Sequence, residues 1–378
     1  MTKIFLVAGE ASGDMLGAAL MRALQCAESG ITFAGVGGRE MTSAGLASLF
    51  PLEDIAVMGL TPVLARLPLL ARRLDETVRA VLAAAPDCLV LIDAPDFTHR
   101  VARRLRAANP TIPIVDYVCP SVWAWRPGRA RKMRAYVDRV MAILPFEPAA
   151  LARLDGPPCD YVGHPLIEGL DGFARGDVDA EEKLLVVLPG SREAEVRRMA
   201  PLYGEVVARL RDEFPALEVV VPPTQALAAL VRAETARWPV PPRILRQSEK
   251  FSAFRRARAA LATSGVVTLE LALAGTPMAV AYRVSGPESL LRPLVKLENF
   301  ALPNLILGRS AEDRAVPEFF QRTATPQALA AALAKLLRGG PAREAQLSAF
   351  AALRDEMLSA GASPSRRAAE IVLFCAKR

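Results

Sequence analysis

The 378-residue sequence contains little histidine and cysteine, and several catalytic motifs are missing from it. Its two histidines, His99 and His164, belong to no HExxH motif or Cys/His cluster, which argues against metal chemistry. The absence of a G-x-S-x-G elbow argues against a serine hydrolase, and the absence of a GxGxxG fingerprint argues against a nicotinamide or flavin enzyme. The five cysteines form no CxxC pair, so we expect reduced, buried thiols in a cytosolic protein.

Long apolar runs are missing as well. No uninterrupted stretch is long enough to cross a bilayer, and the apolar run near the N-terminus is too short for a signal peptide. We therefore expect a protein that is neither secreted nor integral to a membrane. The charge is +7 with a pI near 9.4, which favours anionic partners. Nucleic acid is not expected among them, because the arginines are dispersed and the few tryptophans are clustered.

Short apolar runs bounded by turn residues alternate with helical patterns along the first part of the chain, as in a doubly wound parallel sheet. The expected strands are Lys3–Ala8, Ile31–Val36, Cys88–Ile92, Ile112–Val118 and Arg139–Leu144. The expected helices are Met15–Cys26, Ala65–Ala83, Phe97–Ala108 and Arg129–Ala135, and His99 is expected on the surface of the third.

The same alternation resumes after residues 168–182, which are rich in Gly and Asp and are expected to form a linker. The expected strands there are Leu184–Leu188, Leu217–Val221, Arg243–Leu245, Ala259–Thr263 and Met278–Tyr282, with helices at Glu193–Phe214, Val266–Ala274 and beyond Pro326. The sequence thus predicts an α/β protein of two Rossmann-like domains facing a cleft. We expect them at 1–165 and 166–340, with C-terminal helices in 341–378 packing back on the first.

Two turns of the first domain carry candidate catalytic residues. Residues 9–14, GEASGD, join the first strand to the first helix, where glycines and free helix amides suit an anion. Glu10 and Ser12 of this turn are candidate site residues, although an ordinary strand–helix turn would also explain the glycines. Asp93 follows a buried strand, where α/β sheets place ligands, and is a candidate general base. Asp96 is expected to cap the next helix.

Two turns of the second domain have the composition of phosphate-binding loops. Gly190 and Ser191 can offer amides and a hydroxyl to a phosphate, and Arg192 can offer a bidentate donor, although a capped helix start is the alternative. Ser264 and Gly265 repeat this design before a helix. The candidate donor-site residues are Gly190, Ser191, Arg192, Ser264, Gly265, Thr268 and Glu270, the last spaced to bond a ribose.

Two further segments suggest contacts with substrate or membrane. Trp125 and Arg126 could form a wall against a sugar or acyl group, although tryptophan pairs are usually found in a core or an interface. A basic cluster at Arg126, Arg129, Arg131, Lys132 and Arg134 could bind a substrate phosphate or the membrane, or only cover a helix. Residues 60–73 are apolar with flanking arginines, typical of an element in the headgroup plane or of a buried helix. Its candidate membrane residues are Val63, Leu64, Leu67 and Leu70.

Together these segments resemble the lipid-A-disaccharide synthase family over nearly the whole chain. The matching segments are AGEASGD (8–14), VMGL (57–60), IDAPDF (92–97), PSVWAWR (120–126), LPFE (144–147), VGHP (162–165), LPGSREAEV (188–196), TSGVVTLE (263–270) and LPNLILG (302–308). The chain departs from the family at Val266, where threonine is common, which removes one expected hydroxyl contact with the nucleotide.

The resemblance implies an inverting, GT-B-type glycosyltransferase of lipid A biosynthesis, bound peripherally to the cytoplasmic face of the inner membrane. It would join UDP-2,3-diacylglucosamine to 2,3-diacylglucosamine 1-phosphate (lipid X) without a metal or other cofactor. The resemblance places Glu10, Asp93 and Asn304 around the reacting sugars, with Asp93 preferred to Glu10 as the base. It also leaves open a homodimer. The alternatives are a UDP-N-acetylglucosamine 2-epimerase-like enzyme, which needs no apolar surface segment, and a non-catalytic lipid-binding protein, which needs no Asp93.

Overall fold

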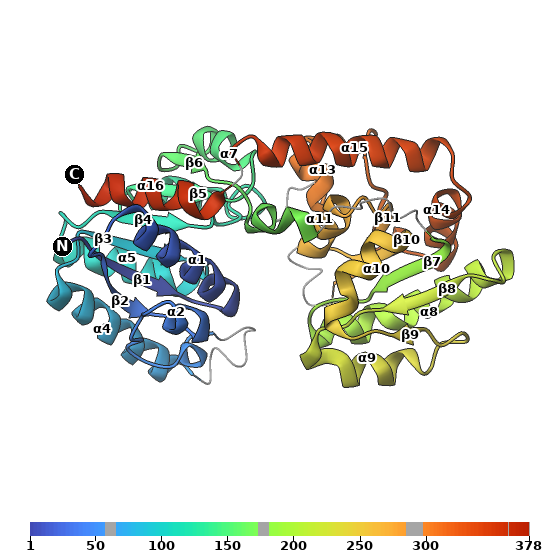
Figure 1. The fold of residues 1–378 in the computed structure, drawn as a ribbon, viewed down its shortest axis with the longest axis horizontal. Helices are drawn as coiled ribbons and strands as arrows, with labels where there is room; N and C mark the ends of the chain where they lie inside the picture. Colours follow the sequence, from blue (N-terminus) through green and yellow to red (C-terminus); the bar gives the residue numbers. More distant parts are fainter. Residues whose placement is uncertain (57–65, 173–180, 285–297, 362, 378) are drawn as a thin grey trace. The chain divides into compact units, whose positions relative to one another are not determined.

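The computed structural model describes residues 1–56, 66–172, 181–284, 298–361 and 363–377. The chain divides into two compact units (Figure 1). The first comprises Met1–Glu168 and Leu358–Arg378, and the second comprises Gly169–Met357. The second unit is therefore inserted into the first.

The first unit has a parallel sheet in the order β2-β1-β3-β4-β5-β6. Its strands are β1 Lys3–Ala8, β2 Thr32–Val36, β3 Cys88–Ile92, β4 Ile114–Tyr117, β5 Arg139–Ala142 and β6 Cys159–Tyr161. Its helices are α1 Ala11–Ala27, α2 Arg39–Ser43, α4 Leu67–Ala84, α5 Pro95–Ala108, α6 Gly128–Met133, α7 Glu147–Arg153 and α16 Pro364–Ala376, with a 3₁₀ turn η1 Leu52–Asp54. Strand β3 is apolar throughout and β1 is apolar after Lys3, as expected where helices cover both faces of a sheet.

The second unit repeats this architecture in the order β12-β11-β10-β7-β8-β9. Its strands are β7 Glu181–Leu188, β8 Glu218–Val221, β9 Arg243–Ile244, β10 Ala257–Thr263, β11 Met278–Tyr282 and β12 Glu318–Phe320. Its helices are α8 Glu193–Glu213, α9 Ala228–Thr235, α10 Lys250–Arg256, α11 Val266–Leu273, α13 Leu302–Ile306, α14 Pro326–Arg338 and α15 Pro341–Leu358; η3 Gln225–Leu227, η4 Gln247–Glu249 and η6 Gln321–Thr323 are 3₁₀ turns. A further 3₁₀ segment, η2 Pro165–Gly172, spans the boundary between the units.

The two C-terminal helices belong to different units. Helix α15 stays with the second, where the Gln346 side chain exchanges two hydrogen bonds with the backbone of Met278 at 2.8 and 3.0 Å. Helix α16 packs against α1 in the first unit and buries Ala368, Ala369 and Val372 in its core (Figure 1). The return to the first unit thus begins at residue 358, whereas the sequence predicts it from 341.

Each sheet has one place where the strand order reverses. In the first unit the chain starts at β1, adds β2 on one side and then β3 on the other. In the second it starts at β7, adds β8 on one side and later β10 on the other. Ligands of open α/β sheets bind at the carboxyl ends of the strands at such a reversal. We therefore expect ligands at the carboxyl ends of β1 and β3 in the first unit, and of β7 and β10 in the second.

Candidate functional site

In the first unit, the two predicted turns meet at the reversal point. Residue Gly9, after β1, donates a backbone hydrogen bond to the carbonyl of Ile92 at the end of β3 (3.2 Å). A Cβ atom at position 9 would lie 2.1 Å from the Cβ of Ala94, which real atoms do not tolerate. Glycine is required here because the two turns pack backbone against backbone.

Asp93 lies in a strained turn. Both Asp93 and Ala94 have positive φ values, 59° and 43°, in the left-handed region that side chains other than Gly rarely occupy. The turn is held because Asp93 donates to the Tyr117 carbonyl (3.1 Å), and the Thr98 hydroxyl lies 3.0 and 3.1 Å from the carbonyls of Asp93 and Ala94. Strain held by buried neighbours is common at functional sites. Thr98 was not predicted, because its target lies outside any local motif.

The Asp93 carboxylate lies beside the predicted first turn. Ser12 Oγ donates to Asp93 Oδ2 at 3.0 Å, and the amide of Ala94 donates to Asp93 Oδ1 at 2.8 Å. Glu10 immediately precedes α1 with a half-buried side chain. The structure therefore brings Ser12 and Asp93 together and places Glu10 in the same turn as Ser12.

Neighbouring acidic residues have other roles. The buried carboxylate of Asp14 accepts backbone hydrogen bonds from Gly38, Glu40 and Met41, at 2.7 to 3.1 Å, and so anchors the start of α2. The prediction that Asp96 caps α5 is wrong. The helix begins at Pro95, with Ala94 as its cap, and the exposed Asp96 side chain instead lies 3.4 Å from Arg129.

The two tryptophans of the segment 120–126 have different environments. Trp123 packs edge-on against Phe146 and donates through Nε1 to the buried Glu147 carboxylate (3.2 Å). Trp125 is 41% exposed, with the Arg126 guanidinium 4.3 Å from its ring centre. Trp123 is therefore part of the packing, and Trp125 with Arg126 is the pair that remains accessible to a ligand.

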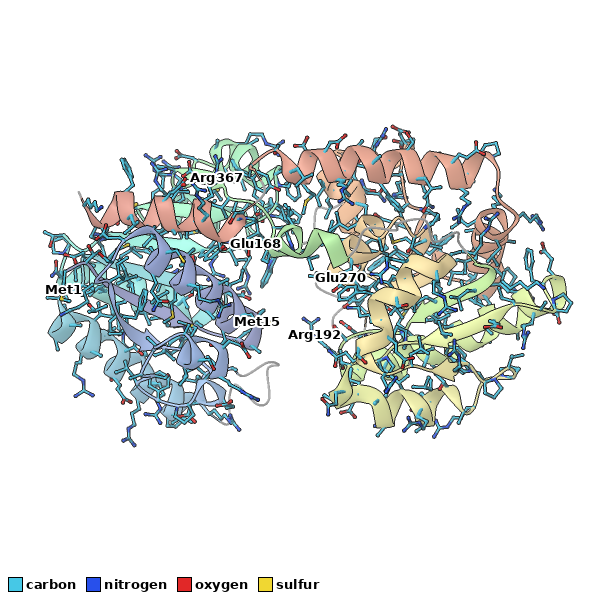
Figure 2. The ribbon with its side chains drawn as sticks, in the orientation of Figure 1. Met1, Met15, Glu168, Arg192, Glu270 and Arg367 are labelled. Carbon is cyan, nitrogen blue, oxygen red and sulfur yellow. The ribbon has the colours of Figure 1, made fainter. Side chains whose placement is uncertain are left out.

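In the second unit, the turn after β7 is shaped by a residue outside the predicted set. The buried Glu195 carboxylate accepts from the Ser191 amide (3.0 Å) and pairs with Arg192 (3.0 Å). Gly190 has φ 136°, and a Cβ there would lie 2.5 Å from the Cβ of Glu195. The Arg192 side chain is 61% exposed, so it remains accessible to an anion (Figure 2).

The turn after β10 leaves space above Gly265. This residue has φ 150°, and a Cβ on it would have no neighbour within 4 Å, so its backbone faces open space. Ser264 Oγ donates to the Phe300 carbonyl (2.8 Å). Thr268 is fully buried and its hydroxyl donates to the Gly265 carbonyl (2.8 Å). Thr268 therefore stabilises the turn, and a contact between its hydroxyl and a nucleotide is not supported by this arrangement.

Glu270 has a partner that the sequence did not reveal. Its carboxylate pairs with the Lys250 ammonium at 2.5 Å, and both side chains are mostly buried (Figure 2 labels Glu270). Lys250 also lies 5.1 and 5.5 Å from the ring centres of Phe251 and Phe254. The pair fixes the position of the Glu270 carboxylate on α11.

Asn304 is enclosed by protein. Its side chain is 0% exposed; Nδ2 donates to the Val316 carbonyl (2.8 Å) and to Glu318 (2.7 Å), and Oδ1 accepts from the Val316 amide (3.0 Å). These bonds give Asn304 a positioning role. A direct contact with a reacting sugar stays a prediction that this arrangement does not favour.

The candidate membrane segment is described in part. Val63 and Leu64 lie outside the described residues. Leu67, the first residue of α4, is 44% exposed, and Leu70 is half-buried. Among the described helices none is long and apolar enough to span a membrane. Within the same part of the chain, no three His, Cys, Asp or Glu side chains cluster as metal ligands would.

The sequence is similar to known proteins over almost its whole length. A family model described as lipid-A-disaccharide synthetase matches residues 4–370. Lipid-A-disaccharide synthases from Rhodopseudomonas palustris and Nitrobacter hamburgensis are 51% and 50% identical, and each comparison covers 98% of this chain and 95% of the relative.

Solved structures show the same fold at low sequence identity. The calicheamicin glycosyltransferase CalG4 gives a TM-score of 0.58 at 17% identity, covering 100% of this chain and 99% of that one. MnaA from S. aureus, solved with UDP, gives 0.58 at 14% identity, covering 99% and 95%. The predicted GT-B-type pair of Rossmann-like domains is confirmed.

Proposed function

Because the chain belongs to the lipid-A-disaccharide synthetase family, we propose that its first unit binds the sugar acceptor and its second unit binds the UDP-sugar donor. The resemblance that the sequence motifs predict is confirmed, and the protein is a glycosyltransferase of lipid A disaccharide synthesis. The substrates implied by the family are UDP-2,3-diacylglucosamine as donor and 2,3-diacylglucosamine 1-phosphate as acceptor. The products are the β-1,6-linked disaccharide 1-phosphate and UDP.

The observation that carries the acceptor half is the Ser12–Asp93 hydrogen bond at the reversal point of the first sheet. Asp93 is held in a strained turn, so its carboxylate does not have to be ordered when substrate binds. We assign it as the general base that takes the proton from the acceptor 6-hydroxyl. Glu10, in the same turn as Ser12, is the alternative base.

In the reaction, the acceptor oxygen O6 forms a bond to C1 of the donor sugar. The bond between C1 and the diphosphate oxygen breaks, its electron pair leaves with UDP, and the hydroxyl proton passes to Asp93. One displacement inverts the configuration at C1, so one base and a stabilised leaving group suffice. No covalent intermediate on the protein is needed.

The donor half must stabilise the charge that develops on UDP. Arg192 supplies an accessible guanidinium, and the open backbone at Gly265 lets a phosphate approach the first amides of α11. We propose that Glu270, whose carboxylate pairs with Lys250, accepts hydrogen bonds from the ribose. We propose that these groups carry the diphosphate charge without a metal or other cofactor.

The location and assembly state follow from the substrates in this proposal. A diacylated donor and acceptor reside at a lipid surface, so we propose peripheral binding to the cytoplasmic face of the inner membrane through Leu67, Leu70 and the segment before them. The basic surplus of the chain suits an anionic surface. A homodimer stays a prediction.

The two alternatives account for less of the protein. UDP-N-acetylglucosamine 2-epimerases share the fold at 12–14% identity, which carries no argument about activity. Relatives near 50% identity over almost the whole chain are named lipid-A-disaccharide synthases. A lipid-binding protein without catalysis would not need a carboxylate held by a strained backbone turn at the reversal point.

The deciding experiment is a detergent-solubilised assay with UDP-2,3-diacylglucosamine and 2,3-diacylglucosamine 1-phosphate, in the presence of a chelator. We expect UDP and a disaccharide from the wild type. Asp93→Asn should lower kcat about 10²- to 10⁴-fold while UDP binding is retained, because a general base contributes roughly that factor. Asparagine tolerates positive φ, so the turn should persist.

Asp75→Asn is the matched control, because Asp75 is an exposed carboxylate on α4, paired with Arg104. It should leave kcat unchanged. Equal activity of Asp93→Asn and wild type would exclude Asp93 as the base and move the assignment to Glu10. UDP release without a disaccharide would contradict the proposed function itself.

A further inference from the structure

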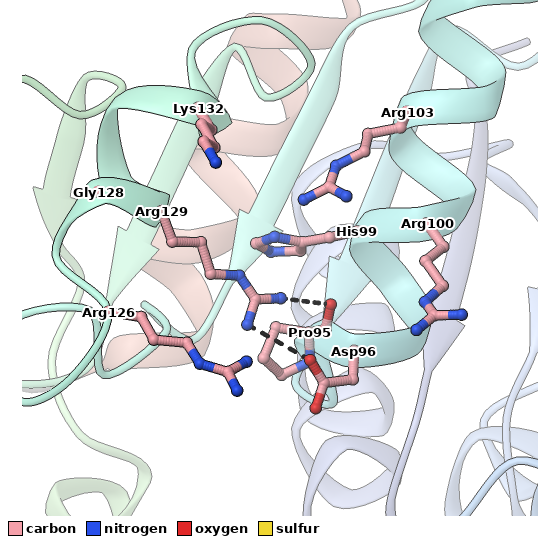
Figure 3. Close-up of a pocket in the computed structure, with 9 residues that line it drawn as sticks. All are labelled: Pro95, Asp96, His99, Arg100, Arg103, Arg126, Gly128, Arg129 and Lys132. Atoms are coloured by element: carbon pink, nitrogen blue, oxygen red, sulfur yellow. Dashed lines mark hydrogen bonds and ion pairs between the residues drawn. The ribbon is translucent and has the colours of Figure 1, made fainter. Parts of the chain in front are cut away.

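A basic pocket lies in the first unit between the start of α5 and α6 (Figure 3). Its volume is about 430 Å³, within the range of about 300–1,000 Å³ typical of small-molecule sites. It is lined by Pro95, Asp96, His99, Arg100, Arg103, Arg126, Gly128, Arg129 and Lys132. Asp93, Arg192 and Glu270 are not among these lining residues.

The charge in the pocket is strongly unbalanced. Five cationic side chains, those of Arg100, Arg103, Arg126, Arg129 and Lys132, face a single carboxylate, Asp96. Within the described chain, Arg100 and Lys132 have no ion-pair partner. Like charges around one cavity repel each other unless an anion neutralises them, so the pocket has the electrostatics of an anion site.

Several of these cations are already held in position. Arg129 donates to the Pro95 carbonyl (2.7 Å) and lies 3.4 Å from Asp96, as Figure 3 shows. Arg103 donates to the Tyr136 hydroxyl (3.3 Å), with its guanidinium 4.9 Å from the ring centre. These side chains would therefore lose little conformational freedom when a ligand binds.

The floor of the pocket is a buried polar network. His99 is 1% exposed, so the prediction that it lies on the helix surface is wrong. Its Nε2 lies 2.9 Å from Asp116 Oδ2, and its Nδ1 lies 3.3 Å from the Tyr136 hydroxyl that also holds Arg103. Helix α5 therefore contributes five of the lining residues: the buried His99, the half-buried Pro95 and the exposed Asp96, Arg100 and Arg103.

One donor of the pocket is unsatisfied. Arg129 Nε is buried and has no hydrogen-bond partner among the described residues. Leaving a buried donor unpaired costs about 1–3 kcal/mol, and such groups are rare in native proteins unless a ligand or water uses them. The unpaired donor and the surplus of cations point independently to a missing acceptor.

The pocket begins beside the proposed catalytic turn. Pro95 and Asp96 line it and follow Asp93 by two and three residues. Guanidinium groups bind phosphate through paired N–H donors, which a planar fork supplies better than a single ammonium. In an acceptor bound at Asp93 through its 6-hydroxyl, C5 and C1 flank the ring oxygen, so the 1-phosphate lies only a few bonds from that hydroxyl.

We propose that this pocket binds the phosphate monoester of the acceptor sugar, with Arg100, Arg126, Arg129 and Lys132 as its ligands and Arg103 adding charge. The inference rests on the proposed function, since it assigns the acceptor to the first unit. It divides the basic cluster of residues 126–134 into two sets. Arg126, Arg129 and Lys132 line the pocket, whereas Arg131 and Arg134 pair with Asp155 outside it.

The test compares two doubly substituted proteins in the detergent assay. Arg100→Gln with Lys132→Gln removes two exposed pocket cations, and Arg131→Gln with Arg134→Gln removes two cations from the other set. Each is assayed with the 1-phosphate acceptor and with the same diacylglucosamine lacking the phosphate. Detergent removes the membrane from the comparison, and the donor KM is measured alongside.

We expect the pocket variant to raise KM for the phosphorylated acceptor about 10- to 100-fold, because two charge-assisted contacts are lost. KM for the unphosphorylated acceptor and for the donor should stay unchanged, as should every value in the control variant. An equal rise for both acceptors would overturn the proposal, because the cations would then act on the sugar or on the fold. An equal effect of the two variants would also overturn it.

Two further measurements separate other causes. Binding to phosphatidylglycerol vesicles distinguishes a lipid headgroup: a pocket variant that loses vesicle binding but keeps its acceptor KM overturns the proposal. If the wild type forms no disaccharide, the proposed function fails, and the pocket is judged by thermal stabilisation with glucosamine 1-phosphate. If glucosamine 1-phosphate stabilises the wild type and the control variant but not the pocket variant, a phosphate site is supported. If it does not stabilise the wild type, the proposal is overturned.

Discussion

Glu147 is a buried carboxylate in the first unit, close to the segment that carries Trp125. It accepts hydrogen bonds from Trp123 Nε1 (3.2 Å) and from the amide of Leu144 (3.0 Å). Burial outweighs these donors and raises the pKa of Glu147 to about 7. Protons therefore bind this group more tightly in the folded protein than in the unfolded chain.

This residue should make the first unit less stable as the pH rises. A raised pKa in the folded state stabilises the protein below the unfolded value of 4.5, and that stabilisation is lost as the pH passes through about 7. The loss amounts to about 3 kcal/mol. Glu147→Gln should be less stable than wild type at pH 5, because a hydrogen bond is lost. The difference in the free energy of unfolding should shrink between pH 5 and 8, because only the wild type loses stability as Glu147 ionises.

Chemical unfolding followed by tryptophan fluorescence measures this difference. A Trp238→Phe background leaves Trp123 and Trp125, both in the first unit, as the only tryptophans. Glu40→Gln, an exposed carboxylate of the same unit, controls for the loss of one negative charge. If the difference in the free energy of unfolding between wild type and Glu147→Gln does not vary with pH, Glu147 is ionised over the whole range from pH 5 to 8.

The sequence indicated which turns follow the strands at the two reversal points, but not the contacts within those turns. Asp93 and Ser12 could be chosen because their turns follow buried strands. The roles of Thr98, Glu195 and Lys250 could not be, because each depends on a partner or a turn geometry that no motif encodes. Polar side chains in a turn can face a ligand or bond to the protein, and only the folded backbone decides between them.

Helix α4 presents apolar side chains to solvent at both of its ends. Leu67 at its start is 44% exposed, and Leu82 near its end is 38% exposed. Of these two, only Leu67 lies within residues 60–73, the candidate membrane segment. The two leucines therefore form a matched pair for testing that assignment on one helix.

Leu67→Ser should weaken binding to anionic vesicles about 10-fold or more, because inserting one leucine side chain contributes about 1.5–3 kcal/mol. Leu82→Ser should have no effect, and neither change should lower the melting temperature. Vesicle co-sedimentation with a thermal unfolding scan measures both. A fall in melting temperature for Leu67→Ser alone would mean that this residue is part of the core.

Elements with long apolar runs were predictable, and short ones were not. The bounds of β1, β3 and β11 agree with the sequence prediction, because each strand is an apolar run, preceded in β1 by Lys3. The three-residue strands β6 and β12 were missed, since each is only half-buried and too short to show a period. Helix α1 begins at Ala11, four residues before the predicted start, because the Gly-rich turn already has helical geometry.

The whole chain is arranged as an insertion, with α16 completing the first unit after the second is finished. Val372 of this helix is fully buried in the core of the first unit. Val372→Asp should destabilise that unit by several kcal/mol, because an unpaired carboxylate would be buried. Hydrogen exchange should show lost protection in β1, β3 and α1, and unchanged protection in β7 and β10.

Phe374→Asp is the control, because Phe374 lies on the same helix and is 49% exposed. Its effect on exchange should be small. Unchanged protection in the first unit of the Val372→Asp protein would show that α16 is not needed for its stability. Equal loss in both units would show that they unfold together.

The insertion also sets an order of events during synthesis. The ribosome makes all six strands of the first sheet by residue 161, but α16 follows roughly 200 residues later. At about 5–20 residues per second, this interval is on the order of 10 to 40 s. Throughout it the surface of α1 that α16 covers is open to chaperones and proteases. A premature stop codon between Leu358 and Pro364 would therefore yield a complete second unit attached to an unfinished first unit.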